Sequence, residues 1–478
     1  MRNPAEYGSH AHAQPDGSGR AVTSGRCVVT EPEFTATERG WLAEVAGALA
    51  DALLAGPWDV DSMASRASYT VGENGRWITE LVRLAHLAYP EPPTGSPREL
   101  TRFLQVAPPL PNIFAAALAS DRSPPVVHHR TVAPTRMEPS RCPVPVWHTT
   151  VDLANHLGLT IGELAWFADV RGWEIRTRVE RLRHYRYRLL AKRHGGYRLL
   201  ESPKWQLREI QRRILHEVVD LIPVHEAVHG FRPGHSPLTH AAGHTGSRVA
   251  IRLDLENFFG RVSAGRVWGL FRLAGYPEQV AYALSGLVTN SVPAAFRRRL
   301  ATANSAEAAW LGVPHLPQGA PTSPALANLA AYRLDQRLGG LAASVDGRYS
   351  RYADDIAISG GPPVLHAASR LVRLAGRIAA EEGFVVNPAK TAVVGSGSRQ
   401  QLTGLVVNRR VNVPRPTFDR LKATLHNAAV HGPASQNRSG HGDFRAHLAG
   451  RVSWVESVNP AKGARLRRIF EQIDWTGI

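Results

Sequence analysis

The chain has 478 residues, of which 43% are hydrophobic and 20% are charged, and its formal net charge is +17 at pH 7. This length allows two or three domains, and the basic excess favours a polyanionic partner, nucleic acid before membrane. The two cysteines, Cys27 and Cys142, lie far apart without zinc spacing, so we expect a reduced, cytoplasmic protein without structural zinc. No apolar run reaches transmembrane length, and residues 1–30 lack the apolar core of a signal peptide, so we expect no membrane partner.

The first part of the chain is predicted to be a tail followed by a helical domain. Residues 1–30 are rich in Gly, Ser, His and Pro without periodicity, which is typical of a disordered tail. Residues 31–120 contain a capping box at Thr35 and Glu38 and stretches with helical patterning over 41–53, 77–87 and 99–106. We interpret them as an α-helical domain whose apolar stripes form its core, with docking to RNA or a protein as the alternative. The Pro-rich residues 121–146 predict a linker.

A basic stretch dominates the region that follows. Residues 151–159 and 161–166 predict two short helices around a glycine turn. Between residues 171 and 213 there are 14 Lys or Arg against 4 Glu, with Tyr and Trp interleaved. Such a pattern favours a nucleic-acid track, in which charges hold phosphates and rings stack on bases, over the alternative of an exposed basic helix. The candidate contacts are Arg186, Arg188, Lys192 and Arg193.

Three acids further along predict a metal site. Residues 249–254 indicate a buried strand that ends in Asp254, and Asp354 and Asp355 lie at or beside a tight turn between strands predicted over 349–352 and 356–358. A strand end and a hairpin can bring three carboxylates together, and such a cluster is costly unless divalent cations neutralise it. We therefore predict a site for two Mg²⁺ ions, with Mn²⁺ as the substitute, suited to nucleotidyl transfer.

These two stretches resemble motifs A and C of the reverse-transcriptase palm. Motif C of that family is Tyr-Ala-Asp-Asp, as at 352–355, and motif A is an Asp followed by a short run to an aromatic residue, here Asp254 to Phe259. The resemblance implies that Asp254, Asp354 and Asp355 hold the metal ions together with the backbone carbonyl of Leu255.

Blocks that resemble the fingers of the same family precede these motifs. In the first block, Arg198, Lys204 and Arg208 are candidates to hold template phosphates or the incoming triphosphate. Residues 229–236 resemble the second block, and its glycines allow a turn and close backbone approach to nucleic acid.

Two segments resemble bacterial retron enzymes in particular. Those enzymes carry Asn-Ala-x-x-His where this chain has residues 240–244, with His240 in place of the Asn and His244 retained. His244 has two interpretations, a nucleic-acid contact or a structural hydrogen-bonding residue. Residues 401–408 resemble the retron Val-Thr-Gly segment, with Leu402 in place of Val, and predict a hairpin whose Thr403 and Gly404 support the primer end.

The remaining blocks concern the incoming nucleotide. Residues 316–324 resemble motif B, a Pro-Gln-Gly loop before a helix that starts near Ser323, and place Gln318 and Gly319 against the nascent base pair. Lys390, in the next block, would neutralise or protonate the leaving pyrophosphate. The Phe259 ring would pack beneath the sugar and exclude a 2′-hydroxyl, while Phe258, on an extended segment, would face the palm core.

The resemblance covers about residues 147–478 and implies an α+β right-hand polymerase with an extra N-terminal α-helical domain. Fingers and palm are expected over 147–415 and a helical, RNA-binding thumb over 416–478. The implied activity is RNA-directed DNA polymerisation of the retron type. Its implied partners are a structured non-coding RNA and its cDNA, dNTPs and an effector or toxin protein. The alternatives are a group II intron-like or other defence-associated reverse transcriptase, and a non-catalytic RNA-binding scaffold.

Overall fold

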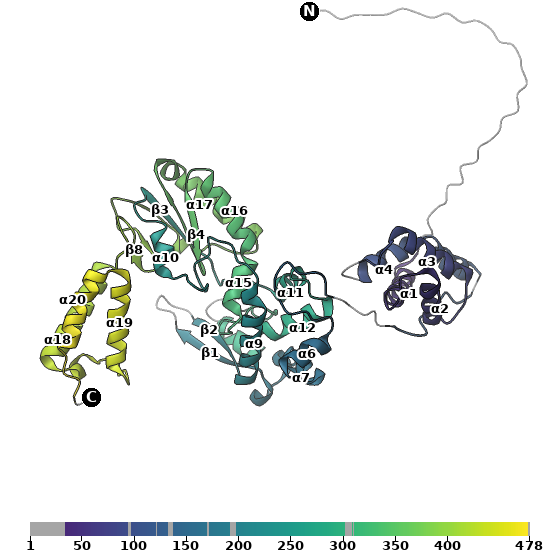
Figure 1. The fold of residues 1–478 in the computed structure, drawn as a ribbon, viewed down its shortest axis with the longest axis horizontal. Coiled ribbons are helices and arrows are strands. Elements are labelled where there is room, and N and C mark those ends of the chain that lie inside the picture. The colour runs from purple at the N-terminus through teal and green to yellow at the C-terminus, as the bar shows by residue number, and fades with distance from the viewer. Residues whose placement is uncertain are drawn as a thin grey trace, which may run out of the picture. The chain divides into compact units, whose positions relative to one another are not determined.

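The computed structural model describes residues 34–93, 97–120, 122–131, 137–169, 172–191, 197–301, 308 and 310–476. The chain forms two compact units, whose main division falls between residues 133 and 134 (Figure 1). The tail predicted over 1–30 lies outside the described residues. Within them, no helix combines the length and the apolar character needed to cross a bilayer.

The first unit is built from helices, as predicted. They are α1 (Ala36–Leu54), α2 (Val60–Val71), α3 (Arg76–Ala88), α4 (Pro97–Val106) and α5 (Pro109–Ala119). The capping box is confirmed, because the Thr35 side chain accepts from the Glu38 N–H and the Glu38 carboxylate accepts from the Thr35 N–H. Helices α2 and α5 fall outside the predicted stretches. The α2 face that packs inward includes the small Ala67 and the polar Thr70, and α5 begins with prolines that resemble a helix break.

The second unit begins with a helical segment and a β-hairpin. The helices are α6 (Thr150–Leu157), α7 (Ile161–Phe167), α8 (Trp173–Arg176) and the 3₁₀ turn η1 (Glu180–Leu182). Gly158 ends α6 in the left-handed region, which confirms the predicted glycine turn. Strands β1 (Tyr185–Ala191) and β2 (Tyr197–Pro203) pair antiparallel, and α9 (Trp205–Glu217) follows. The alternative of an exposed basic helix is therefore wrong for residues 185–191 and 197–203.

A sheet of four strands forms the centre of the second unit. Its order is β4 (Arg348–Tyr352), β5 (Asp355–Gly360), β3 (Val249–Asp254) and β6 (Ala392–Gly395), all neighbours antiparallel. The strands predicted over 249–254, 349–352 and 356–358 are confirmed. One face packs on α16 (Tyr332–Ala343) and α17 (Pro362–Glu381) (Figure 1). Alternate residues such as Ile251 and Ile358 supply that core, which leaves the acids on the other face.

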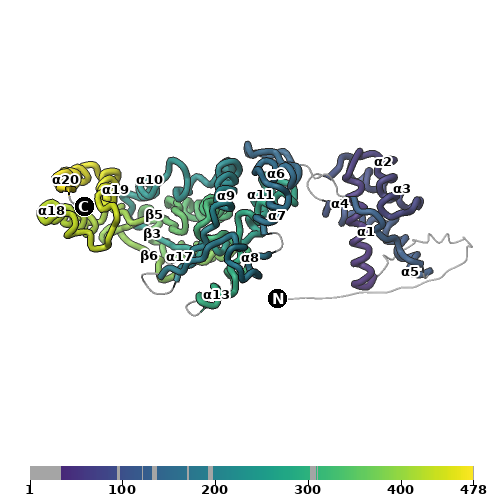
Figure 2. The backbone as a smooth tube through the Cα atoms, turned by 90° about the horizontal axis from the view of Figure 1, so that it is seen from below, coloured from purple at the N-terminus to yellow at the C-terminus, as the bar shows by residue number. Residues whose placement is uncertain are grey.

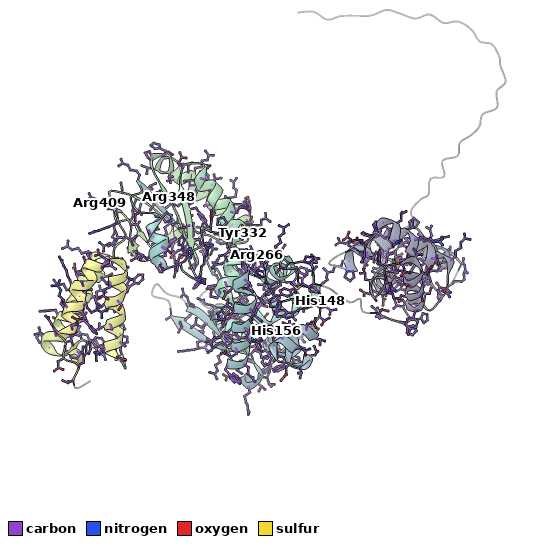
Figure 3. All side chains as sticks on the ribbon, in the orientation of Figure 1. His148, His156, Arg266, Tyr332, Arg348 and Arg409 are labelled. Carbon is purple, nitrogen blue, oxygen red and sulfur yellow. The ribbon has the colours of Figure 1, made fainter. Side chains whose placement is uncertain are left out.

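Further helices complete the second unit, and polar contacts link some of them. They are η2 (Val219–Leu221), α10 (Pro237–Ala242), α11 (Ala264–Leu273), α12 (Glu278–Val288), α13 (Ala294–Ala301), α15 (Ser323–Ala330) and η3 (Pro388–Lys390). Arg266 of α11, labelled in Figure 3, donates to the carbonyls of Ala330 and Glu382 at 2.7 and 2.8 Å. This contact joins α11 to the ends of α15 and α17.

The C-terminal part consists of a small hairpin and helices. Strands β7 (Gln401–Leu402) and β8 (Leu405–Val406) form the predicted hairpin, with Thr403 and Gly404 both at positive φ in its turn. Helices α18 (Arg415–His431), α19 (Phe444–Val458) and α20 (Pro460–Glu471), with the 3₁₀ turn η4 (Pro433–Gln436), pack on one another around Leu425, Leu448 and Leu466. Figure 2 shows these helices side by side, so the helical character predicted for residues 416–478 is confirmed.

Candidate active site

The strand register brings the three predicted acids together. Asp254, the last residue of β3, lies directly opposite Asp355, the first residue of β5, so both side chains leave the same face of the sheet. Asp354 lies in the turn between β4 and β5, and its carbonyl accepts from the Leu255 N–H at 2.9 Å. The turn depends on Ala353, which adopts φ 55°.

The acids repel one another electrostatically. Burial and the neighbouring charge of Asp254 raise the pKa of Asp354. Burial, followed by Asp354 and Asp254, raises the pKa of Asp355 to about 6. Like charges held this close favour a bound cation, because each carboxylate destabilises the ionised form of the next.

Lys390 supplies a cation to this cluster. Its ammonium donates to both carboxylate oxygens of Asp254 at 2.9 Å, and the Asn387 N–H donates to the Asp254 carbonyl at 2.8 Å. The predicted block around Lys390 therefore does reach the acids. In this structure its ammonium contacts the predicted metal ligand itself, whereas a role at the leaving group requires the side chain to move to a phosphate.

The donor atoms of the site suit a hard divalent cation. Three carboxylates and the Leu255 carbonyl offer oxygen only, the chemistry that Mg²⁺ prefers. Among the described residues, no three His, Cys, Asp or Glu side chains converge closely enough to hold a metal ion as a set. Both Asp254 oxygens are engaged by Lys390, so ligation by Asp254 requires that this ion pair open.

Residues that the sequence analysis did not single out hold the Asp354 turn in place. Arg351 is fully buried, and its guanidinium donates to both oxygens of Asp335 at 2.7 Å and to the Ala353 carbonyl at 2.9 Å. The same group donates to the Asn328 side chain at 3.0 Å. A buried ion pair of this kind fixes a backbone conformation. In the sequence, the arginine inside a predicted strand just before the acidic turn was the signal that could have pointed to this buried ion pair.

Gly230 packs against the same turn from outside the sheet. A Cβ at Gly230 would lie 2.5 Å from the Ala353 nitrogen, and the Gly230 carbonyl accepts from Asn328 at 2.8 Å. Gly230 therefore allows a close backbone approach to the Asp354 turn, while an approach of this block to nucleic acid stays a prediction.

The fingers hairpin carries one arginine toward the acids. Arg198 on β2 is exposed, and its charge favours the ionised form of Asp354, which places it near the site. Lys204 and Arg208 are instead engaged locally. The Lys204 ammonium donates to the Glu180 carbonyl at 2.6 Å, and Arg208 donates to the Pro203 carbonyl at 3.0 Å. Arg186 and Arg188 are exposed on β1, and Lys192 and Arg193 lie outside the described residues.

The Pro-Gln-Gly loop is attached to this hairpin. The Gln318 carbonyl accepts from the Glu201 N–H of β2 at 2.9 Å. Gly319 has φ 130°, and a Cβ there would lie 3.0 Å from the Glu201 carbonyl. Ser323 begins α15, as predicted, and its hydroxyl donates to the Pro317 carbonyl at 2.7 Å. Only glycine combines this backbone conformation with this close approach.

A buried polar network surrounds the side chain of Glu201, the β2 residue that is hydrogen-bonded to the Gln318 loop. The Glu201 carboxylate accepts from Asn290 at 2.7 Å and lies 3.1 Å from His315 Nε2. His315 Nδ1 lies 2.7 Å from the Val313 carbonyl, so both ring nitrogens face acceptors. Burial alone would lower the pKa of His315, but Glu201 and these hydrogen bonds raise it. With an acceptor at each ring nitrogen, His315 makes both hydrogen bonds only when it carries both ring protons.

The two phenylalanines of motif A lie in different environments. Phe258 is 4% exposed and packs against Phe384 and under the Arg351 guanidinium. Phe259 is half-buried, with its ring 6.2 Å from that of Phe231. The expected extended segment is wrong, because residues 256–260 form turns and Asn257 has φ 48°. The buried position expected for Phe258 is nevertheless confirmed.

Comparisons with known proteins agree with this geometry. Residues 190–408 match the family described as "Reverse transcriptase (RNA-dependent DNA polymerase)". The chain is 40% identical over 343 residues to the Retron Mx65 reverse transcriptase of Myxococcus xanthus, which covers 71% of this chain and 75% of that protein. The chain belongs to the retron reverse transcriptases. It is 37% identical over 329 residues to the Retron Mx162 enzyme of the same organism, with 65% of this chain and 64% of that protein covered. It is 28% identical over 297 residues to the Retron Ec86 enzyme of Escherichia coli, with 61% and 82% covered.

Membership of this family makes the protein an RNA-directed DNA polymerase with the right-hand fold. The sheet that carries the acids is its palm. Both the intron-like alternative and the non-catalytic scaffold are set aside by the comparisons.

The retron-like segments meet at one side of this palm. His244 is buried, with Nδ1 2.7 Å from Ser359 Oγ and Nε2 2.6 Å from Ser350 Oγ. The structure therefore places His244 as a hydrogen-bonding link between strands β4 and β5. His240, which stands where retron reverse transcriptases carry Asn, lies 3.4 Å from Thr403 Oγ1. Thr403 and Gly404 of the hairpin thus lie beside α10, next to the palm.

Proposed function

We propose that this retron reverse transcriptase copies its own structured non-coding RNA and starts DNA synthesis from a 2′-hydroxyl of a guanosine in that RNA. The product is a branched RNA–DNA hybrid. We place this activity in the cytoplasm and in defence against phage, with an effector or toxin protein as a further partner. Family membership and the basic hairpin support an RNA partner.

The chemistry proposed is two-metal nucleotidyl transfer. When bound, the divalent ions neutralise the phosphates and activate the attacking hydroxyl. Asp254, Asp354, Asp355 and the Leu255 carbonyl would hold them. The register of β3 and β5, which sets Asp254 opposite Asp355, is the observation that carries the proposal.

Other residues would bind the nucleotide around this centre. Arg198 would hold a phosphate of the incoming triphosphate, because it already lies near Asp354. Gln318 and Gly319 would lie against the nascent base pair, on the loop attached to the fingers hairpin. Lys390 would pass from Asp254 to the leaving pyrophosphate, which keeps one positive charge beside the acids throughout.

Substitution of Asp354 by Asn tests the assignment. The change removes the charge with little change in volume, so we expect primer extension on a primed RNA with Mg²⁺ to slow by at least about two to three orders of magnitude. RNA affinity and thermal stability should stay near those of the wild type. Asp346→Asn is the matched control, because Asp346 is an exposed palm residue whose left-handed backbone Asn tolerates. An Asp354→Asn enzyme that extends at the wild-type rate would refute the site.

The branched product has its own test. Expression of the protein together with the proposed non-coding RNA should yield DNA that stays attached to RNA after denaturation. A debranching enzyme that cleaves 2′,5′ bonds should release this DNA. DNA that is already free before such treatment would show ordinary 3′ priming, and would leave the polymerase assignment intact.

A further inference from the structure

We propose that the groove between α18 and α19 binds one unpaired nucleotide, whose base stacks on Trp454 and whose phosphate pairs with Arg451. The inference deepens the proposed function, since it assumes that the thumb contacts nucleic acid. It names a contact to an unpaired base, which differs from a grip on a duplex backbone.

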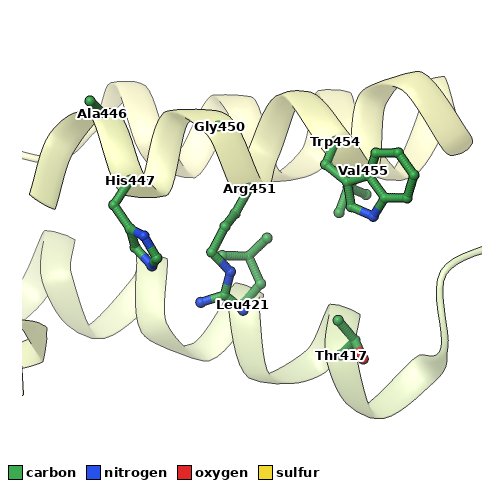
Figure 4. A pocket seen from close by; sticks show the side chains of 8 residues that line it. All are labelled: Thr417, Leu421, Ala446, His447, Gly450, Arg451, Trp454 and Val455. Carbon is green, nitrogen blue, oxygen red and sulfur yellow. The ribbon is translucent and has the colours of Figure 1, made fainter. Parts of the chain in front are cut away.

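The groove is formed by one face of each helix. It encloses about 370 Å³ between α18 and α19. Figure 4 shows His447 and Arg451 reaching from α19 toward α18, with the Trp454 indole at one end. These residues recur at positions i, i+4 and i+7, which places them on one side of a helix over about 10 Å. The lining residues are Thr417, Leu421, Ala446, His447, Gly450, Arg451, Trp454 and Val455.

The lining has the chemistry of a nucleotide site. Leu421 and Val455 are buried and give an apolar floor, while 40% of the Trp454 side chain is exposed. His447 stacks on His441 with ring centroids 3.9 Å apart. Burial, His441 and Arg451 lower the pKa of His447, which favours the uncharged ring. The groove thus pairs aromatic faces with one cation, and none of its eight described lining residues is acidic.

The exposed indole favours an unpaired base over a duplex. Both faces of a base inside a duplex are covered by its neighbours, so an aromatic ring can stack on a duplex only at its two ends, whereas every base of a single strand is available. The net charge of +17 and the absence of acids from this lining favour a polyanion over an apolar peptide. An RNA that folds into stems with loops or bulges would present such bases.

Binding of the full-length chain to two labelled probes, in EDTA to prevent synthesis, tests the proposal. The probes are a short oligouridine and a blunt RNA–DNA duplex of the same length. Trp454→Ala should weaken oligouridine binding about 5- to 100-fold, the range given by loss of one base stack, and should leave duplex binding within about 2-fold. Trp454→Phe should retain most of the affinity, because a smaller ring can still stack.

Matched controls separate stacking from damage to the fold. Trp41→Ala removes an indole that is 48% exposed in the first unit, and should change neither affinity. Arg451→Gln should weaken oligouridine binding and reduce its salt dependence, whereas Arg465→Gln, at an exposed position of α20 outside the groove, should have the smaller effect.

Three results would overturn the proposal. The first is an unchanged oligouridine affinity in Trp454→Ala. The second is an equal loss for both probes, which would indicate a duplex contact or a disturbed thumb. The third is normal RNA binding by all groove variants, combined with the loss of a protein that wild-type enzyme binds in a pull-down. That result would show that the groove binds protein. Wild-type protein that binds neither probe would instead contradict the proposed function itself.

Discussion

Phe258 and Phe259 are neighbours in the sequence but differ in burial. Phe258 packs in the palm core against Phe384, and Phe259 is half-buried beside Phe231. Because residues 256–260 turn, the alternation of an extended strand does not explain this split. Asn257, with its left-handed backbone, turns the chain between Asp254 and the two rings.

Substitution of the two rings should therefore have different effects. Phe259→Ala should raise ribonucleotide incorporation with a small loss of stability, because steric exclusion of the 2′-hydroxyl is removed. Phe258→Ala should destabilise the protein by about 3–5 kcal/mol, as for other buried Phe truncations, without changing sugar selection. Primer extension with ribo- and deoxynucleotides, and a thermal melt of each variant, measure both effects. Unchanged sugar selection in Phe259→Ala would place the sugar elsewhere.

At the scale of elements, the palm strands were predictable and the fingers hairpin was not. Strands β3 and β5 are mostly apolar runs with an acid at one end, and their burial follows from that pattern. Strand β1 begins with alternating Tyr and Arg, and β2 begins with one such pair, a pattern that does not separate a strand from a basic helix. The Glu201 side chain of β2 is held by Asn290 and His315, which lie far away in the sequence. No local pattern reveals such partners.

The Glu201–His315 pair should control both stability and nucleotide binding. Glu201→Gln removes the charge that faces the buried His315 ring, so we expect a loss of about 3–5 kcal/mol at pH 6, below the ordinary pKa of histidine. It should also raise the KM for dNTPs more than it lowers kcat, because Arg198 and the Gln318 loop share the hairpin that Glu201 anchors. Glu209→Gln, on the exposed face of α9, is the control. Equal losses in both variants would contradict a specific role for the pair.

The same pair predicts a direction for the pH dependence. The pKa of His315 is raised in the folded state, so its contribution to stability is fully present below the unfolded value of about 6.5. That contribution is lost as pH rises through the folded pKa. Thermal melts from pH 6 upward should therefore fall more steeply for the wild type than for His315→Gln. Parallel curves would show that His315 is neutral in the fold.

At the scale of the whole molecule, the charge of +17 should be visible in the salt dependence of RNA binding. Each lost phosphate contact lowers the slope of log K against log salt by about 0.7 for a single strand. Arg186→Gln combined with Arg188→Gln should thus flatten it by about 1.4. Lys192 and Arg193 were predicted to belong to the same nucleic-acid track. Substituting them as well should flatten the salt slope further. Arg370→Gln with Arg373→Gln, on the exposed side of α17, should leave it unchanged.

The contact between Gly230 and Ala353 constrains how this enzyme can diverge or be recombined. A side chain at position 230 would strike the backbone that sets the catalytic turn, although more than 100 residues separate the two in the sequence. Asn328 donates to the Gly230 carbonyl, and Arg351 donates to the Ala353 carbonyl and to Asn328, so hydrogen bonds connect the four positions. Chimaeras between retron enzymes should keep their activity when segments 225–235 and 325–355 come from the same parent. Crossovers that separate these segments should inactivate the hybrid even where each parent is fully active.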